Sequence, residues 1–165
     1  MFIKVMSRVE LESEFYLAVK ESSMPHIILS TTSNRANPIV SIKENPNCRG
    51  ILRFQFDDID LRHKKYLVEN NKVTKYNLFY VEHAKSILNF INDNIYKVES
   101  IITGCDAGIS RSSAMAASLS KIILGEDDYF FKHYLPNMLV YTEILKEYNY
   151  NMDVYKNICK FNSTL

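Results

Sequence analysis

The segment Ser100–Ser113, with the sequence SIITGCDAGISRSS, decides how the rest of the chain must fold. It begins with a short apolar run typical of a buried strand, continues through a loop that contains glycine, and ends where a helical pattern starts. Cys105 and Arg111 flank that loop, with five residues between them. A loop of this length can curl around a tetrahedral oxyanion and bring a thiolate and a guanidinium to the same ligand. The segment therefore predicts a phosphate-binding site.

The backbone and the side chains of this loop both suit an anion. A strand, a loop and a helix N-terminus in succession leave several N–H groups unpaired and pointing inward, and the helix dipole adds positive charge there. The same field favours the thiolate form of a cysteine. Arg111 supplies a planar fork for two phosphate oxygens, and Gly108 lets the backbone approach closely. The Ser112 hydroxyl is expected to donate a hydrogen bond to the sulfur of Cys105.

Strand and helix patterns alternate along the rest of the chain. Further strands are expected at 2–6, 26–30 and 51–56, with a brief strand at 39–42 in the polar loop 31–50. Helices are expected over 76–95, 112–124, 126–134 and 137–148, and a first helix after Ser7 has the apolar face Leu11, Phe15, Ala18 and Val19. This alternation predicts an α/β fold, with a mostly parallel central sheet of four to five strands flanked by helices on both faces.

An acidic cluster follows the expected strand 51–56. It consists of Asp57, Asp58 and Asp60, and in a parallel sheet it would lie beyond the same strand ends as the Cys105 loop. Attack by sulfur on a phosphate ester requires an acid on the opposite side to protonate the departing oxygen, which commonly contributes about 10²- to 10⁴-fold in rate. The three aspartates are candidates for that acid. The alternative is that they cap a turn or the next helix.

The loop resembles the signature of the cysteine-dependent protein tyrosine phosphatase superfamily, specifically its small dual-specificity members. That signature is H-C-x2-G-x2-R-[ST], and this chain has G-C-D-A-G-I-S-R-S; the order of elements is similar from about His26 to Tyr148. The resemblance implies that Cys105 is the nucleophile and that Ser112 assists breakdown of the intermediate. The phosphate-binding groups it implies are the Arg111 side chain and the amides of Asp106, Ala107, Gly108, Ile109, Ser110 and Arg111. The F-D-D stretch at 56–58 is similar to that of phosphatases of the regenerating-liver type, which implies that Asp58 is the general acid.

The resemblance implies a hydrolase that acts on phosphotyrosine, phosphoserine or phosphothreonine through a cysteinyl-phosphate, with no cofactor or metal. Gly104 departs from the pattern because it replaces the histidine that normally precedes the nucleophile, and it favours an alternative: a phosphate-recognition module with weak activity. The interval between Asp58 and Cys105 is also longer than in compact members of the family. The additional residues fall in the basic segment 61–74, which is either a substrate-facing insertion or a solvated loop. A third alternative is sulfur transfer or arsenate reduction at a similar loop, but neither reaction accounts for the cluster of Asp57 and Asp58.

The bulk properties narrow the class of protein. A chain of 165 residues suits one domain over 1–165, and a formal net charge of +1 gives no general attraction to nucleic acid or membrane surfaces. The apolar run in residues 1–8 is too short for a signal peptide, and no apolar run in the sequence approaches the ~18 residues of a membrane span. The three cysteines, Cys48, Cys105 and Cys159, lack metal-ligand spacing and indicate a reducing, cytoplasmic setting. The expected partner is a phosphorylated protein or another phosphomonoester.

Overall fold

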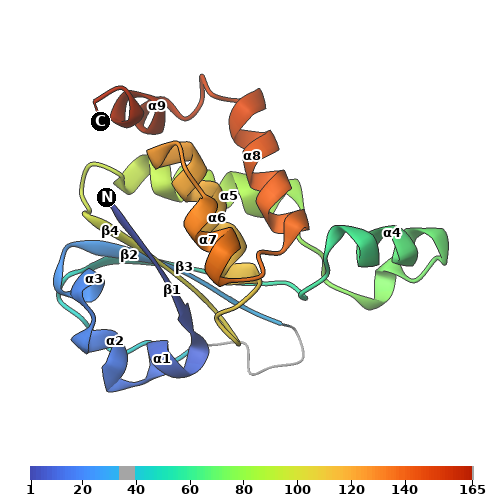
Figure 1. The fold of residues 1–165 in the computed structure, drawn as a ribbon, viewed down its shortest axis with the longest axis horizontal. Coiled ribbons are helices and arrows are strands. Elements are labelled where there is room, and N and C mark those ends of the chain that lie inside the picture. Colours follow the sequence, from blue (N-terminus) through green and yellow to red (C-terminus); the bar gives the residue numbers. More distant parts are fainter. Residues whose placement is uncertain (34–39, 165) are drawn as a thin grey trace.

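A parallel sheet forms the centre of the computed structural model, which describes residues 1–33 and 40–164. Its strands in these residues are β1 (Phe2–Ser7), β2 (His26–Thr32), β3 (Cys48–Gln55) and β4 (Ser100–Cys105). They lie in the order β1-β4-β2-β3, and every neighbouring pair is parallel. The predicted α/β class with a parallel sheet of four strands is confirmed (Figure 1).

The C-terminal half of the chain covers one face of the sheet. Its helices are α5 (Val81–Asn94), α6 (Arg111–Leu124), α7 (Asp128–His133), α8 (Met138–Tyr150) and α9 (Lys156–Asn162) (Figure 1). The predicted helix over 112–124 is confirmed as α6, which is buried over nearly its whole length. Its small side chains allow close packing against the sheet on one side and α8 on the other. The helix α9 lies beyond the last predicted element, which ends at residue 148.

Three short helices cover the opposite face: α1 (Arg8–Glu12), α2 (Glu14–Ala18) and α3 (Lys20–Ser23). The prediction of one continuous helix after Ser7 is wrong in this respect. The backbone of Ser13 is extended, and its hydroxyl accepts a hydrogen bond from the N–H of Phe15 at 3.3 Å. A serine that caps a new helix ends the previous one, because its side chain competes with the helical backbone pattern.

This break also changes which side chains of the segment are buried. Leu11 and Tyr16 are completely buried, whereas Phe15, which was expected on the apolar face, is 48% exposed. Leu11 and Tyr16 pack with Met6 and Ile28 in a small cluster beneath β1 and β2. Because of the break at Ser13, the segment packs on the sheet through two separate side chains, Leu11 and Tyr16, and not through one long amphipathic face.

Other boundaries differ locally from the expectations. The helix predicted over 76–95 begins only at Val81, and the residues before it form an extended segment in which Phe79 is still buried. A helix, α4 (Leu61–Glu69), and a short 3-10 helix, Val73–Lys75, occupy most of the basic segment 61–74. Residues 40–42 form no strand, and the first residue of the strand proposed for 39–42 lies outside the described residues.

The strand register brings the two predicted site segments to one edge of the sheet. Cys105, the last residue of β4, is paired with Ser7 at the end of β1, and Gly104 is paired with Ser30 of β2. The chain leaves β3 at the same edge, where the N–H of Phe56 donates to the carbonyl of Thr32 at 3.1 Å. The carboxyl ends of all four strands thus frame the loop 105–111. In the part of the chain that the structure describes, no helix is long and apolar enough to cross a membrane.

Candidate active site

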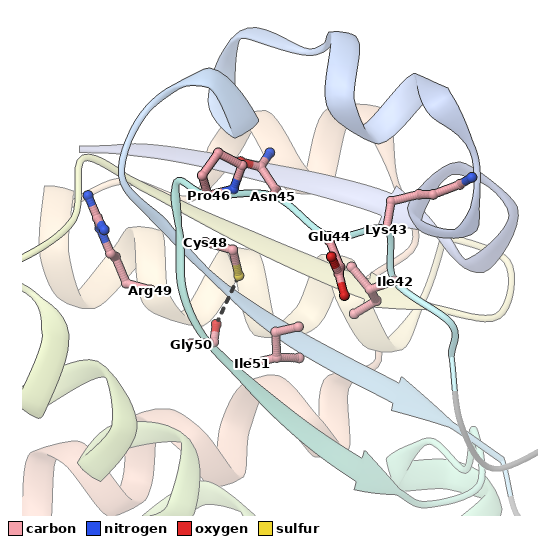
Figure 2. Close-up of a pocket in the computed structure, with 9 residues that line it drawn as sticks. All are labelled: Ile42, Lys43, Glu44, Asn45, Pro46, Cys48, Arg49, Gly50 and Ile51. Carbon is pink, nitrogen blue, oxygen red and sulfur yellow. Dashed lines mark hydrogen bonds between the residues drawn. The ribbon is translucent and has the colours of Figure 1, made fainter.

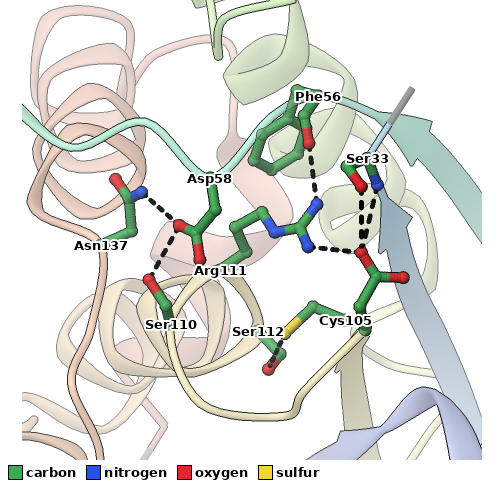
Figure 3. Close-up of polar contacts among 9 residues, drawn as sticks. Ser33, Phe56, Asp58, Cys105, Ser110, Arg111, Ser112 and Asn137 are labelled. Atoms are coloured by element: carbon green, nitrogen blue, oxygen red, sulfur yellow. Dashed lines mark hydrogen bonds and ion pairs between the residues drawn. The ribbon is translucent and has the colours of Figure 1, made fainter. Parts of the chain in front are cut away.

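The loop 105–111 begins at a buried cysteine and ends at a buried arginine. Cys105 is 3% exposed, and its Sγ lies 3.0 Å from the Oγ of Ser112 in the first turn of α6. The hydroxyl of Thr103 donates to the carbonyl of Ser112 at 3.0 Å, which ties the start of α6 to β4. The hydrogen-bond contact expected between Ser112 and the sulfur is therefore present (Figure 3).

Gly108 lets the loop lie directly on the end of β1. Its φ is +69°, a left-handed conformation that a residue with a Cβ rarely adopts. A Cβ at this position would lie 2.7 Å from the backbone nitrogen of Ser7 and 3.0 Å from the carbonyl carbon of Met6. Within the described residues, the N–H groups of 107–110 donate no hydrogen bond to the protein. They remain available as donors, as the anion-binding interpretation requires.

The guanidinium of Arg111 joins the loop to the segment after β3. Its Nη1 donates to the carbonyl of Phe56 at 2.8 Å, and its Nη2 donates to Oδ2 of Asp106 at 2.6 Å (Figure 3). The residue is 5% exposed, and its Nε has no hydrogen-bond partner among the described residues. Two nitrogens of Arg111 are thus held by the protein, while its buried Nε–H remains available to donate a hydrogen bond.

The carboxylate of Asp106 has a role that the sequence analysis missed. Besides Arg111, Oδ2 accepts from the N–H of Ser33 at 3.2 Å and from its hydroxyl at 3.4 Å. Oδ1 is buried without a partner in the described chain. Besides the backbone amide expected to bind phosphate, Asp106 thus contributes a side chain that places a negative charge directly beside the arginine.

Asp58 lies across the loop, held by side chains from two other parts of the chain. Its Oδ1 accepts from the hydroxyl of Ser110 at 2.9 Å and from Nδ2 of Asn137 at 2.7 Å, and within the described residues Oδ2 accepts no hydrogen bond (Figure 3). Asn137 is itself fixed because its Oδ1 accepts from the N–H groups of Leu139 and Val140 and so caps α8. The structure therefore presents one carboxylate oxygen of Asp58 beside the loop.

The other two aspartates of the cluster serve the backbone. Oδ2 of Asp57 accepts from the N–H of Asn77 at 2.9 Å. Oδ1 of Asp60 accepts from the N–H of His63 at 2.8 Å and so caps α4. Of the three candidates, only Asp58 contacts a residue of the loop. The capping alternative thus describes Asp60, and Asp57 has an equivalent role in the segment before α5.

Asn137 and Ser33 are the contributors that sequence reasoning did not find. The signal at Asn137 was visible as a capping residue after Pro136, but a cap does not indicate what its amide nitrogen will contact. Ser33 stands 73 residues from its partner Asp106, so no local pattern connects them. Both residues enter the site only because the sheet brings distant segments together.

Another hollow, of about 720 Å³, lies at the edge of β3, away from this loop (Figure 2). Its lining comes from residues 42–51. The basic side chains Lys43 and Arg49 point in different directions, and Lys43 pairs with Glu14 at 3.0 Å. Burial raises the pKa of the Cys48 thiol, which makes it less reactive. The hollow thus lacks the convergence of polar groups seen around Cys105.

Comparison with known proteins addresses the fold. No protein-family model matches the chain, and no curated protein matches it by sequence. The solved human tyrosine phosphatase-like serine/threonine/tyrosine-interacting protein is similar over 93% of each chain, with 14% identity and a TM-score of 0.57. The chain has a tyrosine phosphatase-like fold. Human DUSP28 is also similar, with 13% identity over 98% of this chain and 92% of that chain and a TM-score of 0.43. PTPMT1 is similar as well, with 12% identity over 99% of this chain and 96% of that chain and a TM-score of 0.47.

The glycine at position 104, directly before Cys105, has a steric explanation. A Cβ at Gly104 would lie 2.3 Å from Cδ1 of Leu11, a completely buried side chain of α1. A side chain at position 104 would therefore require the buried side chain of Leu11 to move. Within this phosphatase-like fold, the departure at Gly104 is coupled to the packing of the helices on that face.

The described residues contain no group of three or more histidine, cysteine or carboxylate side chains arranged to hold a metal ion. Cys159, the remaining cysteine, lies 3.4 Å from the hydroxyl of Tyr148 and belongs to the contacts between α8 and α9. It has no contact with the loop 105–111 among those described. Cys159 is therefore a useful control residue for experiments on Cys105.

Proposed function

We propose that the protein is a phosphatase that hydrolyses phosphate monoesters through a cysteinyl-phosphate intermediate on Cys105. The observation that carries the proposal is the arrangement of Cys105 and Arg111, at the two ends of one loop, with Asp58 from the segment after β3, at one edge of the sheet (Figure 3). The free N–H groups of 107–110 would bind the phosphate oxygens together with the guanidinium. The phosphatase-like fold is consistent with this chemistry but does not establish it.

In the first step, the thiolate of Cys105 attacks phosphorus. A sulfur–phosphorus bond forms, and the bond from phosphorus to the ester oxygen breaks with its electron pair on that oxygen. Asp58, protonated at Oδ2, gives its proton to the departing oxygen, while Oδ1 stays held by Ser110 and Asn137. Arg111 stabilises the charge on the phosphoryl oxygens as it is transferred. The products are an alcohol or phenol and the phosphorylated enzyme.

In the second step, water attacks phosphorus and the sulfur leaves. Asp58, now a carboxylate, takes the proton of the attacking water and is restored to its acid form. The Ser112 hydroxyl, 3.0 Å from Sγ, donates a hydrogen bond to the developing thiolate and makes it a better leaving group. Inorganic phosphate then dissociates. Asp58 thus acts as acid in the first step and as base in the second, Cys105 is first the nucleophile and then the leaving group, and neither step requires a metal.

The substrates proposed are phosphorylated proteins, through phosphotyrosine and also phosphoserine or phosphothreonine. All three cysteines are free thiols, which suits a reducing compartment such as the cytoplasm. The direct test is hydrolysis of p-nitrophenyl phosphate in the presence of a chelator. We expect vanadate to inhibit turnover, Cys105→Ser to abolish it and the matched Cys159→Ser to retain it. Undiminished turnover by Cys105→Ser would refute the proposal.

A second candidate is a phosphate-recognition module that binds phosphorylated partners with negligible turnover. The observation in its favour is Gly104, whose neighbouring space is filled by Leu11, so that no histidine precedes the nucleophile. Equilibrium binding of a phosphotyrosine peptide to the wild-type protein, followed by analysis of that peptide, separates the two. Intact peptide after prolonged incubation at saturating protein favours the module, whereas released phosphate favours the enzyme.

A further inference from the structure

An open groove lies beside the loop 105–111 and plays no part in the chemistry described above. It has a volume of about 480 Å³, and its described lining consists of Asp60, Ile109, Ser110, Phe131, Tyr134, Leu135, Pro136 and Met138. A second hollow of about 380 Å³ shares three of these residues and adds Leu61 and Arg62. The two hollows thus form one continuous groove between the start of α4 and the connection from α7 to α8.

Several apolar side chains that line the groove are exposed. Leu135 is 77% exposed, Ile109 is 49% exposed and Phe131 is 41% exposed. Leu61 and Met138 are also more than one-third exposed at its other end. Single exposed apolar residues are ordinary, but a contiguous set around a hollow marks a binding surface.

The groove is continuous with the proposed phosphate site. Ile109 and Ser110 belong to the loop and also line the groove, and the Ser110 hydroxyl contacts Asp58 at 2.9 Å. A substrate whose phosphate lies in the loop must extend outward past Asp58, where its ester oxygen is protonated. The parts of the substrate next to the phosphorylated residue therefore reach the groove.

The charges around the groove discriminate between substrate classes. Asp60 lines it, Asp58 adjoins it, and the carboxylate of Asp106 lies within the loop itself. Among its described lining residues, Arg62 is the only one with a basic side chain. A substrate with further phosphates, such as RNA or a phosphoinositide, would bring more negative charge toward these carboxylates. An uncharged apolar side chain meets no such repulsion.

We propose that this groove binds a large apolar side chain next to the phosphorylated residue of a peptide substrate. The proposal rests on the proposed function, since it needs the phosphate to be held by the loop 105–111. Burial of a leucine-sized side chain in a partly open groove is expected to raise kcat/KM about tenfold. The groove thus gives the site a sequence preference that the loop alone does not provide.

The test uses two sets of phosphopeptides that are identical except for leucine or serine at the positions flanking the phosphorylated residue. For the wild-type protein, we expect about tenfold higher kcat/KM with the leucine set on at least one side. In Leu135→Ser, that ratio should fall to about twofold or less. The matched control is Val154→Ser, which alters a 55% exposed residue between α8 and α9 and should keep the tenfold ratio.

Binding measurements keep the test independent of turnover. Fluorescence anisotropy with Cys105→Ser, and with Cys105→Ser combined with Leu135→Ser, should show the same leucine preference and its loss. Failure of the proposed function would appear as no hydrolysis of p-nitrophenyl phosphate, while these binding ratios could still hold. Equal kcat/KM and equal affinity for both peptide sets, or tighter binding of 5′-phosphorylated RNA or a phosphoinositide than of either peptide, would overturn the groove assignment.

Discussion

The two ends of the central sheet treat buried polar groups differently. At the amino end of β2, Nδ1 of His26 lies 2.8 Å from the carbonyl of Met24, and Nε2 lies 2.7 Å from the hydroxyl of Tyr16. Because a carbonyl only accepts, Nδ1 carries the proton and donates, and Nε2 accepts from the hydroxyl. Nearby, the hydroxyl of Ser100 donates to the carbonyl of Glu21 at 2.6 Å. The polar side chains buried there are paired within the protein.

At the carboxyl end, by contrast, Thr31 Oγ1, Asp106 Oδ1 and Arg111 Nε are buried without partners. They are three of the four such side-chain atoms in the described residues. Leaving a buried polar atom unpaired costs about 1–3 kcal/mol, so proteins rarely keep several in one place without a reason. The difference indicates that the amino end serves stability, whereas the carboxyl end leaves buried polar atoms unpaired beside the loop 105–111, among them the Nε–H donor of Arg111, which suits a phosphate oxygen.

Among the changes that leave Cys105 in place, the largest effect is expected from breaking the loop at the carboxyl end. Gly108→Ala adds a Cβ at a positive φ and drives it into the backbone of Ser7, so the N–H groups of the loop lose their orientation. We expect kcat/KM for p-nitrophenyl phosphate to fall about 10³-fold or more. The matched control is Gly125→Ala, because Gly125 also has a positive φ of +81° but nothing lies within 4 Å of its Cβ position. Comparable losses in both variants would contradict this account.

The next largest effect should come from the acid. Asp58→Ala is expected to lower kcat roughly 10²-fold, because the departing oxygen loses its proton donor. The loss should be greater for an alkyl phosphate than for p-nitrophenyl phosphate, whose leaving group needs less protonation. Asp57→Ala, which removes only the contact to the N–H of Asn77, should cost less than about tenfold. The opposite ranking of the two variants would assign the acid to Asp57.

A smaller effect distinguishes charge from geometry at Asp106. Asp106→Asn keeps an oxygen that can accept from Nη2 of Arg111 but removes the negative charge, so a phosphate dianion should bind more tightly. We expect KM to fall about three- to tenfold at low salt, with a smaller change at high salt. Asp106→Ala, which also removes the hydrogen bonds from Ser33, should instead lower kcat. A higher KM in Asp106→Asn would mean that the charge assists binding.

The sequence predicted the parts of the site that depend on local geometry. Cys105, Gly108, Arg111 and Ser112 lie within one strand–loop–helix unit, and the conformation of such a unit is set by neighbouring residues. The edge at which Asp58 meets this loop was also predictable, because parallel strands present their carboxyl ends on one side. The parallel order of the sheet follows from the alternation of strands and helices.

What could not be predicted depends on contacts between distant segments. Asn137 and Asp58 are 79 residues apart, and their contact exists only because α8 packs against α6 and places its first turn near the loop. Gly104 reads as an unexplained departure until Leu11 of α1 is seen in the space beside it. The break at Ser13, by contrast, has a local cause, since a serine that caps a new helix also ends the preceding one.

The smallest effect tests the amino end, where pairing serves stability alone. Burial lowers the pKa of His26 below its ordinary value of 6.5, so the folded state keeps this ring neutral at pH values where the unfolded chain binds a proton. The contribution of His26 to stability is therefore present above pH 6.5 and is lost as the pH falls below it. Between pH 6.5 and 5.5 the loss should reach at most about 1 kcal/mol. Urea unfolding of the wild type and of His26→Gln at both pH values measures this loss. The free energy of unfolding should depend less on pH in the variant, and turnover at pH 7 should be preserved. An unchanged pH dependence in His26→Gln would show that the titration of His26 does not cause the loss of stability at this end of the sheet.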